Sequence, residues 1–285
     1  MPASFAAELC GYRGLNGNPN TSDNNDGQSK VLGRALFEEL GVPPTATGPE
    51  DAGTELEKRI EADFRRLRGD LRVSRSTSAA EFEQYEHLLV LKTFRQAISD
   101  APADVDSLIG ALRALPASRE RDTAMRLASQ LEGQVDKQRA AVTALLRDTP
   151  EESLLKIDLT VATERSAGAP RLEVALSAKW SLRTDRAQDC VSQGSKLVSQ
   201  RRGRMPHFAV ITMEPRPAML RILADGSGAV DCVYHLDLGA LERAIRRTAQ
   251  GARGRGLSPL QTYERLRAQR RLRDYDELLE EVERI

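Results

Sequence analysis

The sequence has no run of about 18 or more apolar residues, so it offers no candidate for a membrane-spanning helix. Its first residues, "MPASFAAELCGYRG", lack the basic, apolar and small-residue order of a secretory signal. Three cysteines, Cys10, Cys190 and Cys232, are an odd number without metal-ligand spacing, which indicates neither a disulfide framework nor a zinc site. We therefore expect a cytoplasmic protein with free thiols and no membrane partner.

The chain also lacks net charge, because its 42 acidic residues balance 42 basic ones, but the two signs are segregated. Residues 171–204 hold eight Lys and Arg against three acids, and residues 243–273 hold ten Arg against one acid. The acidic residues gather at 50–63 and in the tail "DYDELLEEVE". Basic segments beside concentrated carboxylates suit a protein that holds a polyanion and a divalent metal. For 243–273 alone, a solvated helical surface is the favoured interpretation.

The first half of the chain has helical patterns, whereas strands and helices alternate in the second half. We expect helices at 30–40, 53–67 and 77–100, the last capped by Ser78, and a helical insertion at about 100–150. Short apolar runs predict strands at 154–163, 171–179, 207–213 and 230–236, with helices at 186–202, 217–224 and 238–250. This order predicts a mixed α/β sheet with helices on both faces, in a single domain over residues 1–285 with its core at about 153–250.

Two glycine-rich stretches, "GARGRG" and "DGSG", do not join a strand to a helix as dinucleotide-binding motifs do, so we expect no nucleotide cofactor. The histidines His87, His207 and His235 lie on apolar stretches without paired ligands. We interpret them as core histidines whose hydrogen bonds are satisfied within the protein rather than as metal ligands.

The first motif with chemical potential joins two of the expected strands. Asp158 interrupts an apolar run and Lys179 ends the next one, so antiparallel pairing through a short loop could bring their side chains together. A carboxylate on a strand can hold Mg²⁺, and a nearby lysine can stabilise charge on a phosphate. Taken alone, however, the pattern fits an ordinary surface ion pair better.

The second motif, "RTDR", follows directly at the start of the helix expected from about residue 186. Arginine forks onto O6 and N7 of guanine, and a carboxylate accepts from N4 of cytosine. Arg183 and Arg186 could each take a guanine while Asp185 bridges the two cytosines of a CC/GG half-site. A symmetric pair of subunits would then read CCGG in double-stranded DNA. An Arg–Asp cluster that caps the helix is the competing interpretation.

The stretch "SAKWSLRTDRAQ", continued by "RRGRMPHFAVITMEPRP" and "GSGAVDCVYHL", resembles the NgoMIV-type type II restriction endonucleases, which are PD-(D/E)XK nucleases with a CCGG core target. The resemblance covers residues 177–236, with a weaker trace over 20–92, where "GTELEKRIEADF" and "FEQYEHL" align. It implies a restriction-endonuclease-like sheet, Mg²⁺-dependent hydrolysis of both strands of a palindrome with 5′ overhangs, and a homo-oligomer, a dimer or a tetramer.

The resemblance also implies roles for particular residues. Asp158 matches the metal-binding aspartate, Lys179 the catalytic lysine, Ser177 the position where the superfamily more often has its second acid, and Glu57 an extra glutamate from an upstream helix. The carbonyl of Ala178 would complete the metal shell. The base readers would be Arg183, Asp185 and Arg186 for CCGG, with Asp23 for the outer base pair.

Two departures from the family pattern affect the expected activity. Gln193 stands where the family carries a glutamate, and Asp189, one helical turn earlier, could replace that carboxylate. "TGPEDAG" before Glu57 replaces a stretch that helps to read the flanking base pair, although Asp23 favours a cytosine partner and hence GCCGGC. We therefore expect a type II restriction endonuclease; the alternatives are a sequence-specific DNA-binding protein whose catalysis has decayed and a PD-(D/E)XK nuclease of repair or recombination.

Overall fold

The structure is a computed structural model of the whole chain that describes all residues except 1–2, 15, 149–154, 226–227 and 250–257. Side chains of 90–92, 94–102 and 145–148 are also outside the description. All of "GARGRG" and part of "DGSG" fall within these gaps, so the expectation for those stretches lies outside the described residues. Among the residues that are described, no helix is long and apolar enough to cross a membrane.

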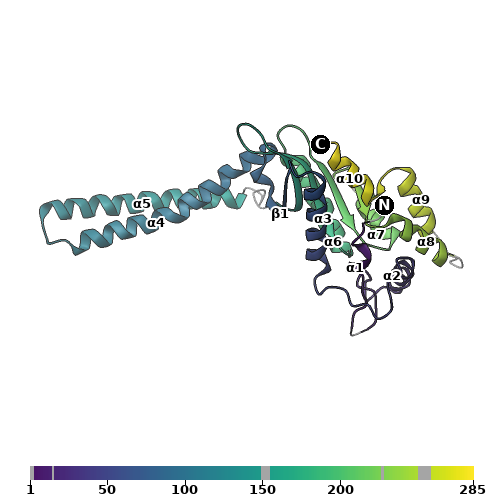
Figure 1. Cartoon of the computed structure of the whole chain (residues 1–285). Coiled ribbons are helices and arrows are strands. Elements are labelled where there is room, and N and C mark those ends of the chain that lie inside the picture. Colours follow the sequence, from purple (N-terminus) through teal and green to yellow (C-terminus); the bar gives the residue numbers. More distant parts are fainter. Residues whose placement is uncertain (1–2, 15, 149–154, 226–227, 250–257) are drawn as a thin grey trace. The chain divides into compact units, whose positions relative to one another are not determined.

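Contacts along the chain define two compact units. Unit 1 holds residues 1–84 and 155–285, and unit 2 holds residues 85–154. Unit 2 contains two long helices that lie side by side, α4 (Leu89–Ala114) and α5 (Arg119–Asp148) (Figure 1). Helical structure is thus present throughout the described part of the expected insertion, and a single domain over 1–285 stays a prediction.

A six-stranded sheet runs through the described part of unit 1, in the strand order β1-β2-β3-β4-β5-β6. Its first two pairings are antiparallel and the other three are parallel, so the sheet is mixed as predicted. The bounds are β1 Arg72–Ser78, β2 Lys156–Thr163, β3 Arg171–Lys179, β4 His207–Thr212, β5 Cys232–His235 and β6 Leu272–Asp274.

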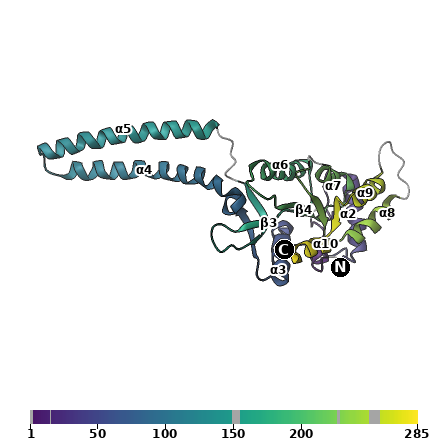
Figure 2. The same cartoon turned by 90° about the horizontal axis from the view of Figure 1, so that it is seen from above.

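Helices cover both faces of this sheet (Figure 2). Two of them, α3 and α10, contact each other and strands on one face, whereas α6, α7 and α9 pack in sequence over the other, and α2 pairs with α8. The bounds in unit 1 are α1 Ala6–Leu9, α2 Gly27–Glu39, α3 Ala52–Leu67, α6 Thr184–Gln200, α7 Pro217–Ala224, α8 Leu238–Ala249, α9 Pro259–Ala268 and α10 Tyr275–Glu283.

The central strand β3 shows why the strands in this half of the chain could be predicted from the sequence. Its residues 174–178 are all buried, as expected for a strand with helices on both sides, and Lys179 at its end is partly exposed. The helix that follows, α6, approaches the sheet closely at Gly194. A Cβ there would lie 2.7 Å from both the carbonyl oxygen of Ala229 and the ring of Phe208, so only glycine permits this packing.

The helix expected over 77–100 is wrong in its first half. Residues 77 and 78 belong to the edge strand β1, which pairs with β2, and Ser78 makes no capping hydrogen bond with its side chain. Two 3₁₀ turns follow, η1 Ala79–Glu81 and η2 Glu83–Leu88, and the α-helix begins only at Leu89. Three large buried side chains of this stretch, Phe82, Tyr85 and Leu88, are three apart, which is the period of a 3₁₀-helix.

Candidate active site

The carboxylate of Asp158 and the end of β3 form a tight polar cluster. Antiparallel pairing of β2 with β3 places Asp158 opposite Ser177. Oδ2 of Asp158 accepts hydrogen bonds from Ser177 Oγ at 3.1 Å, from the Ala178 N–H at 2.9 Å and from Lys179 Nζ at 2.5 Å. The predicted meeting of Asp158 and Lys179 is therefore confirmed, and the serine in the place of a second acid is part of the same cluster.

Glu57 brings a second carboxylate to this cluster from α3. The helix begins after Asp51, whose side chain accepts from the N–H groups of Gly53 and Thr54, and it buries Leu56, Ile60 and Phe64 against the sheet. Partial burial raises the pKa of the Glu57 carboxyl, and the nearby charge of Asp158 raises it further, whereas Lys179 opposes the shift. The two carboxylates thus lie close enough to repel each other.

Oxygen atoms dominate this cluster, and they fit a hard divalent cation. A cation between Asp158 and Glu57 would relieve their repulsion, and the Ala178 carbonyl could supply a third oxygen. Within the described ranges no group of three or more His, Cys, Asp and Glu side chains gathers as a metal site. Two carboxylates and a carbonyl match Mg²⁺ nonetheless, because this ion usually keeps several water ligands.

Gln193 on α6 does not take part in the carboxylate cluster. Its Nε2 donates to the backbone carbonyl of Lys156 at 2.6 Å, so the amide serves the packing of α6 on β2. Asp189, four residues earlier, is exposed on the same side of the helix. Burial raises the pKa of the Cys190 thiol, the Ser177 hydrogen bond and the Lys179 charge oppose the shift, and the charges of Asp158 and Asp189 add to it.

The DNA cleavage that the resemblance implies is therefore expected to fall by about tenfold or more when Asp189 is replaced by alanine, as loss of an outer carboxylate does at many metal sites. Gln193→Ala is expected to cost little, because its amide contacts only a backbone carbonyl. Both rates are measured on one CCGG duplex over a range of Mg²⁺ concentrations. The reverse order, a large loss for Gln193→Ala and none for Asp189→Ala, would show that Asp189 does not compensate.

The side chains of Arg183, Asp185 and Arg186 stand at the start of α6. All three are exposed, and no hydrogen bond or ion pair engages any of them within the part of the chain that is described. Arg183 is the N-cap residue but makes no side-chain capping bond. The interpretation of this motif as a capping cluster is therefore wrong. The first turn of α6 also keeps N–H groups that can face an anion.

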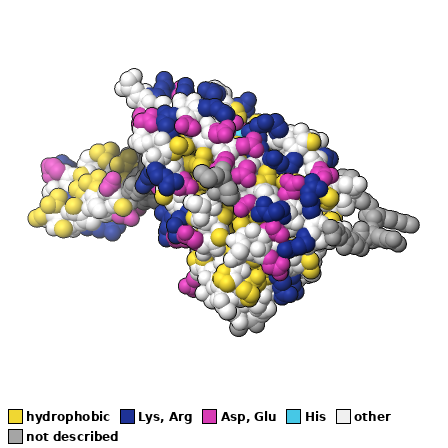
Figure 3. Space-filling view, turned by 45° about the vertical axis from the view of Figure 1, so that its right-hand side comes forward, with side chains coloured by type: hydrophobic (Ala, Val, Ile, Leu, Met, Phe, Trp, Pro, Cys, Tyr) yellow, Lys and Arg dark blue, Asp and Glu magenta, His cyan; other side chains and the backbone are white. Residues whose placement is uncertain are grey.

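The second basic block behaves differently. Each described arginine in 243–273 bonds to a carboxylate or a backbone carbonyl, and several partners come from the acidic tail, for example Glu277 with Arg267 and Arg270. Acidic and basic side chains intermingle on the face of the molecule in Figure 3. Tail carboxylates thus neutralise arginines of this block, and the solvated-surface interpretation of 243–273 is supported.

A cleft of about 280 Å³ lies between the start of α6 and Lys179. Lys179 and Arg186 line it together with residues 49–53, the end of the "TGPEDAG" stretch. Arg13 also lines the cleft, and burial lowers the pKa of its guanidinium, as does the nearby charge of Arg183. Sequence reasoning missed Arg13, since it lies in a Gly- and Asn-rich loop without periodicity.

Arg13 organises the loop that carries Asp23. Its guanidinium donates to the carbonyls of Asn20 and Ser22 and to Oδ1 of Asn24, at 2.8–3.0 Å. Asp23 is partly exposed, and its charge raises the pKa of Arg13 while that of Arg183 lowers it. The structure therefore brings Asp23 to the neighbourhood of Arg183, though not into direct contact with it.

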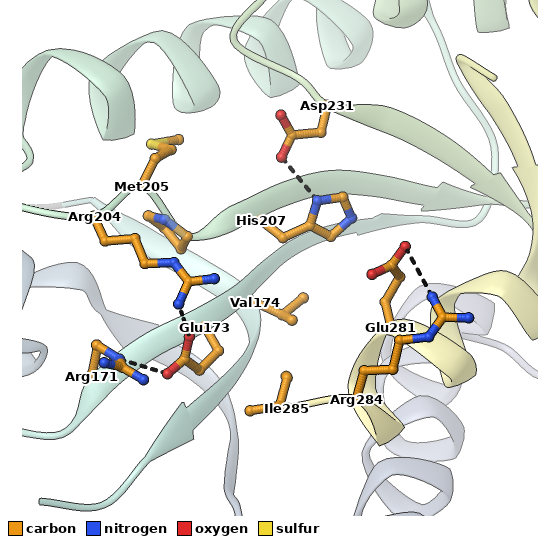
Figure 4. Close-up of a pocket in the computed structure, with 11 residues that line it drawn as sticks. Arg171, Glu173, Val174, Arg204, Met205, His207, Asp231, Glu281, Arg284 and Ile285 are labelled. Carbon is orange, nitrogen blue, oxygen red and sulfur yellow. Dashed lines mark hydrogen bonds and ion pairs between the residues drawn. The ribbon is translucent and has the colours of Figure 1, made fainter. Parts of the chain in front are cut away.

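A second cavity, of about 480 Å³, lies at the opposite end of β3 and β4 (Figure 4). His207 stands in it, and its Nδ1 lies 2.9 Å from Asp231 and its Nε2 3.0 Å from the hydroxyl of Tyr234. The histidine thus has hydrogen-bond partners for both ring nitrogens, as its interpretation as a satisfied histidine predicts, and one of the partners is a charged carboxylate. Burial alone would lower the pKa of His207, but the hydrogen bond that its ring donates to the Asp231 carboxylate raises it to about 9.

Folding stability is expected to fall as pH rises toward this value. The folded protein keeps a proton on His207 up to about pH 9, whereas the unfolded chain releases it near 6.5, so the stabilisation is complete below 6.5 and disappears through 9. Since Asp231 is 46% exposed, we expect a change of only about 1 kcal/mol. Urea unfolding of the wild type and His207→Gln at both pH values measures it; equal pH dependence in the two proteins would contradict it.

The mixed sheet, with an acid on one antiparallel strand and a lysine at the end of the next, defines a restriction-endonuclease-like fold. The model of the NgoMIV restriction enzyme family matches residues 68–279, and the chain belongs to this family. A segment of 95 residues is 42% identical to the Type II restriction enzyme NgoMIV of Neisseria gonorrhoeae, and it covers 32% of this chain and 33% of that enzyme.

The alignment thus spans about a third of the length of this relative. The family match extends the resemblance beyond Leu236 to residue 279. It includes Asp158, Lys179 and the readers on α6, whereas Asp23 and Glu57 precede residue 68. The family match therefore gives no support for the roles of Asp23 and Glu57, and that support comes from their positions in the structure.

Proposed function

We propose that this chain is a type II restriction endonuclease that hydrolyses both strands of a palindrome centred on CCGG, most favourably GCCGGC, with Mg²⁺ and leaves 5′ overhangs. The observation that carries the proposal is the short segment from Lys179 to Arg186. It joins a lysine paired with a strand carboxylate to three exposed, unpaired base-reading side chains at a helix start. Because this segment is short, the distance between the lysine that serves hydrolysis and the side chains that read bases is fixed.

In this proposal Asp158, Glu57 and the Ala178 carbonyl would hold Mg²⁺, which would supply a more acidic bound water and positive charge opposite the scissile phosphate. Lys179, positioned by Asp158, orients the attacking water and stabilises the developing negative charge. Ser177 orients the Asp158 carboxylate by donating a hydrogen bond to it. The new P–O bond forms as the bond to O3′ breaks, which leaves a 5′-phosphate and a 3′-hydroxyl.

Base readout in this proposal uses the unpaired side chains of α6. Arg183 and Arg186 fork onto two guanines, and Asp185 accepts from both cytosines of the half-site. Asp23 reads the outer pair through the amino group of a cytosine. Because a palindrome requires two identical half-sites, the chain acts as a homodimer or as a tetramer of two such dimers on double-stranded DNA in the cytoplasm.

Two other functions remain open to the same test. Gln193 in the place of the family glutamate favours a DNA-binding protein whose catalysis has decayed. A repair or recombination nuclease of the same superfamily is the other alternative, and the reader set argues against it, because structure-selective enzymes need no base readout.

Digestion of a complex genomic DNA with the purified protein and Mg²⁺, followed by sequencing of all new ends, separates the three. We expect ends within CCGG-centred sites only, with 5′ extensions. Ends without a common sequence would favour the repair nuclease, and sequence-specific binding without new ends would favour the decayed reader.

A further inference from the structure

A buried ion pair lies directly behind the two segments that face DNA in the proposed function. Glu214 follows β4 and has a fully buried side chain, and the side chain of Arg216 is only 8% exposed. Arg216 Nε donates to Glu214 Oε1 at 2.6 Å and Nη2 to Oε2 at 3.2 Å, which is a two-point contact. Such a pair is costly to bury unless its remaining polar atoms are satisfied.

The remaining atoms of this pair bind the residue just before the CCGG readers. The N–H of Leu182 donates to Glu214 Oε2 at 2.8 Å, and Arg216 Nη2 donates to the Leu182 carbonyl at 2.5 Å. Leu182 is itself buried, and Arg183 follows it as the N-cap of α6. The N–H of Leu182 is thus bound by Glu214, and its carbonyl is bound by Arg216.

The third face of the guanidinium binds the loop that carries Asp23. Arg216 Nη1 donates to Asp26 Oδ2 at 2.9 Å and lies 3.9 Å from Asp23 Oδ2. Asp26 also caps α2, because its Oδ1 accepts from the N–H groups of Gln28 and Ser29. One arginine therefore connects the start of α2 with the start of α6.

We propose that Arg216 is a positioning residue for specificity, which fixes the distance between Asp23 and the reader set Arg183, Asp185 and Arg186. The inference rests on the proposed function and extends it to a residue that contacts no base. Outer-pair readout requires Asp23 and the CCGG readers to face neighbouring base pairs together. If the link is released, each segment keeps its own readers, but their relative position is no longer set.

The sharpest variant is Asp26→Asn, because asparagine caps helices as well as aspartate does but cannot keep the ion pair with Arg216. Asp26 is 39% exposed, so the change leaves the core intact. Arg216→Lys is the second variant, since lysine keeps the charge but cannot contact Glu214, Leu182 and Asp26 together. Arg271→Lys is the matched control. Arg271 also makes more than one hydrogen bond through its guanidinium, but both go to the carbonyl of Ala224, away from Asp23 and the reader set.

The experiment measures kcat/KM on four duplexes that differ only in the flanking pair, GCCGGC, ACCGGT, TCCGGA and CCCGGG, together with one duplex in which CCGG is permuted. We expect Asp26→Asn and Arg216→Lys to reduce preference for the best flanking pair by about tenfold while preference for CCGG over the permuted core is kept. Arg271→Lys is expected to keep both. Thermal melting of each variant identifies any that fails to fold.

Unchanged flank preference in a folded, active Asp26→Asn protein would overturn the inference. Equal loss of flank and core preference would also overturn it, because a general structural defect affects both. A wild-type protein that discriminates neither flank nor core would contradict the proposed function itself, and the inference with it.

Discussion

Replacing Lys179 by alanine is expected to reduce the rate of DNA cleavage by about 100- to 1,000-fold, which is the usual effect of removing one group that stabilises transition-state charge. The side chain lies against the Asp158 carboxylate at the end of β3, and in the proposed function it stabilises charge on the scissile phosphate. Affinity for the CCGG duplex is expected to change much less, because the reader set lies on α6. Single-turnover cleavage and equilibrium binding on the same duplex separate the two effects.

Lys196→Ala provides the control for this experiment, since Lys196 is an exposed lysine on α6 outside the cluster. It changes the charge by the same amount and is expected to keep the cleavage rate. Undiminished cleavage by Lys179→Ala would remove this lysine from the mechanism and leave the Asp158 contact as a structural ion pair.

Replacing Arg186 by alanine is expected to weaken specific binding by about 1–3 kcal/mol for each half-site, or roughly 10- to 100-fold, because one bidentate contact to guanine is lost. The side chain is exposed and unpaired among the described residues, so its removal disturbs no internal contact. Binding to a permuted duplex of the same composition is expected to change far less. The ratio of the two affinities, measured at one salt concentration, is the informative quantity.

Arg201→Ala at the other end of α6 is the matched control. Arg201 is also exposed, but it donates to the carbonyl of Val198 and terminates the helix. If Arg186→Ala weakened binding to both duplexes equally, the residue would contact phosphates rather than bases, and the readout assignment would be wrong.

The strands that carry the cluster of Asp158 and Lys179 were predictable, because their apolar composition and their burial in the sheet agree. The strands β2 to β5 are apolar and buried, so composition alone indicated them, and the short loop between β2 and β3 implied antiparallel pairing. Asp158 and Lys179 stood out as charged residues at defined places on these strands. Their contact followed from the pairing.

The polar edge of the sheet was not predictable in the same way. The strand "RVSRSTS" has no apolar alternation and depends on its pairing with β2. The 3₁₀ turns after it place apolar residues three apart, which is close enough to helical spacing to suggest one long helix. β6 has only three residues and likewise depends on its neighbour β5.

Charge segregation was visible in the sequence, but the structure distinguishes the two basic blocks. The arginines of 243–273 that the structure describes have acceptors, and those of "RTDR" have none among the described residues. Sequence alone could not assign partners that lie far apart in the chain, such as Arg247 with Glu38 or Arg216 with Asp26. The buried pair behind the readers was missed for the same reason.

The most direct test of the central claim uses a plasmid with two GCCGGC sites, incubated with the purified protein and either Mg²⁺ or EDTA, with Lys179→Ala in parallel. The proposed function predicts discrete Mg²⁺-dependent fragments whose sequenced ends lie at the CCGG-centred sites, and none with EDTA or with the variant. Binding of the sites without any cutting would contradict it, and Gln193→Glu would then show whether the missing carboxylate is the cause.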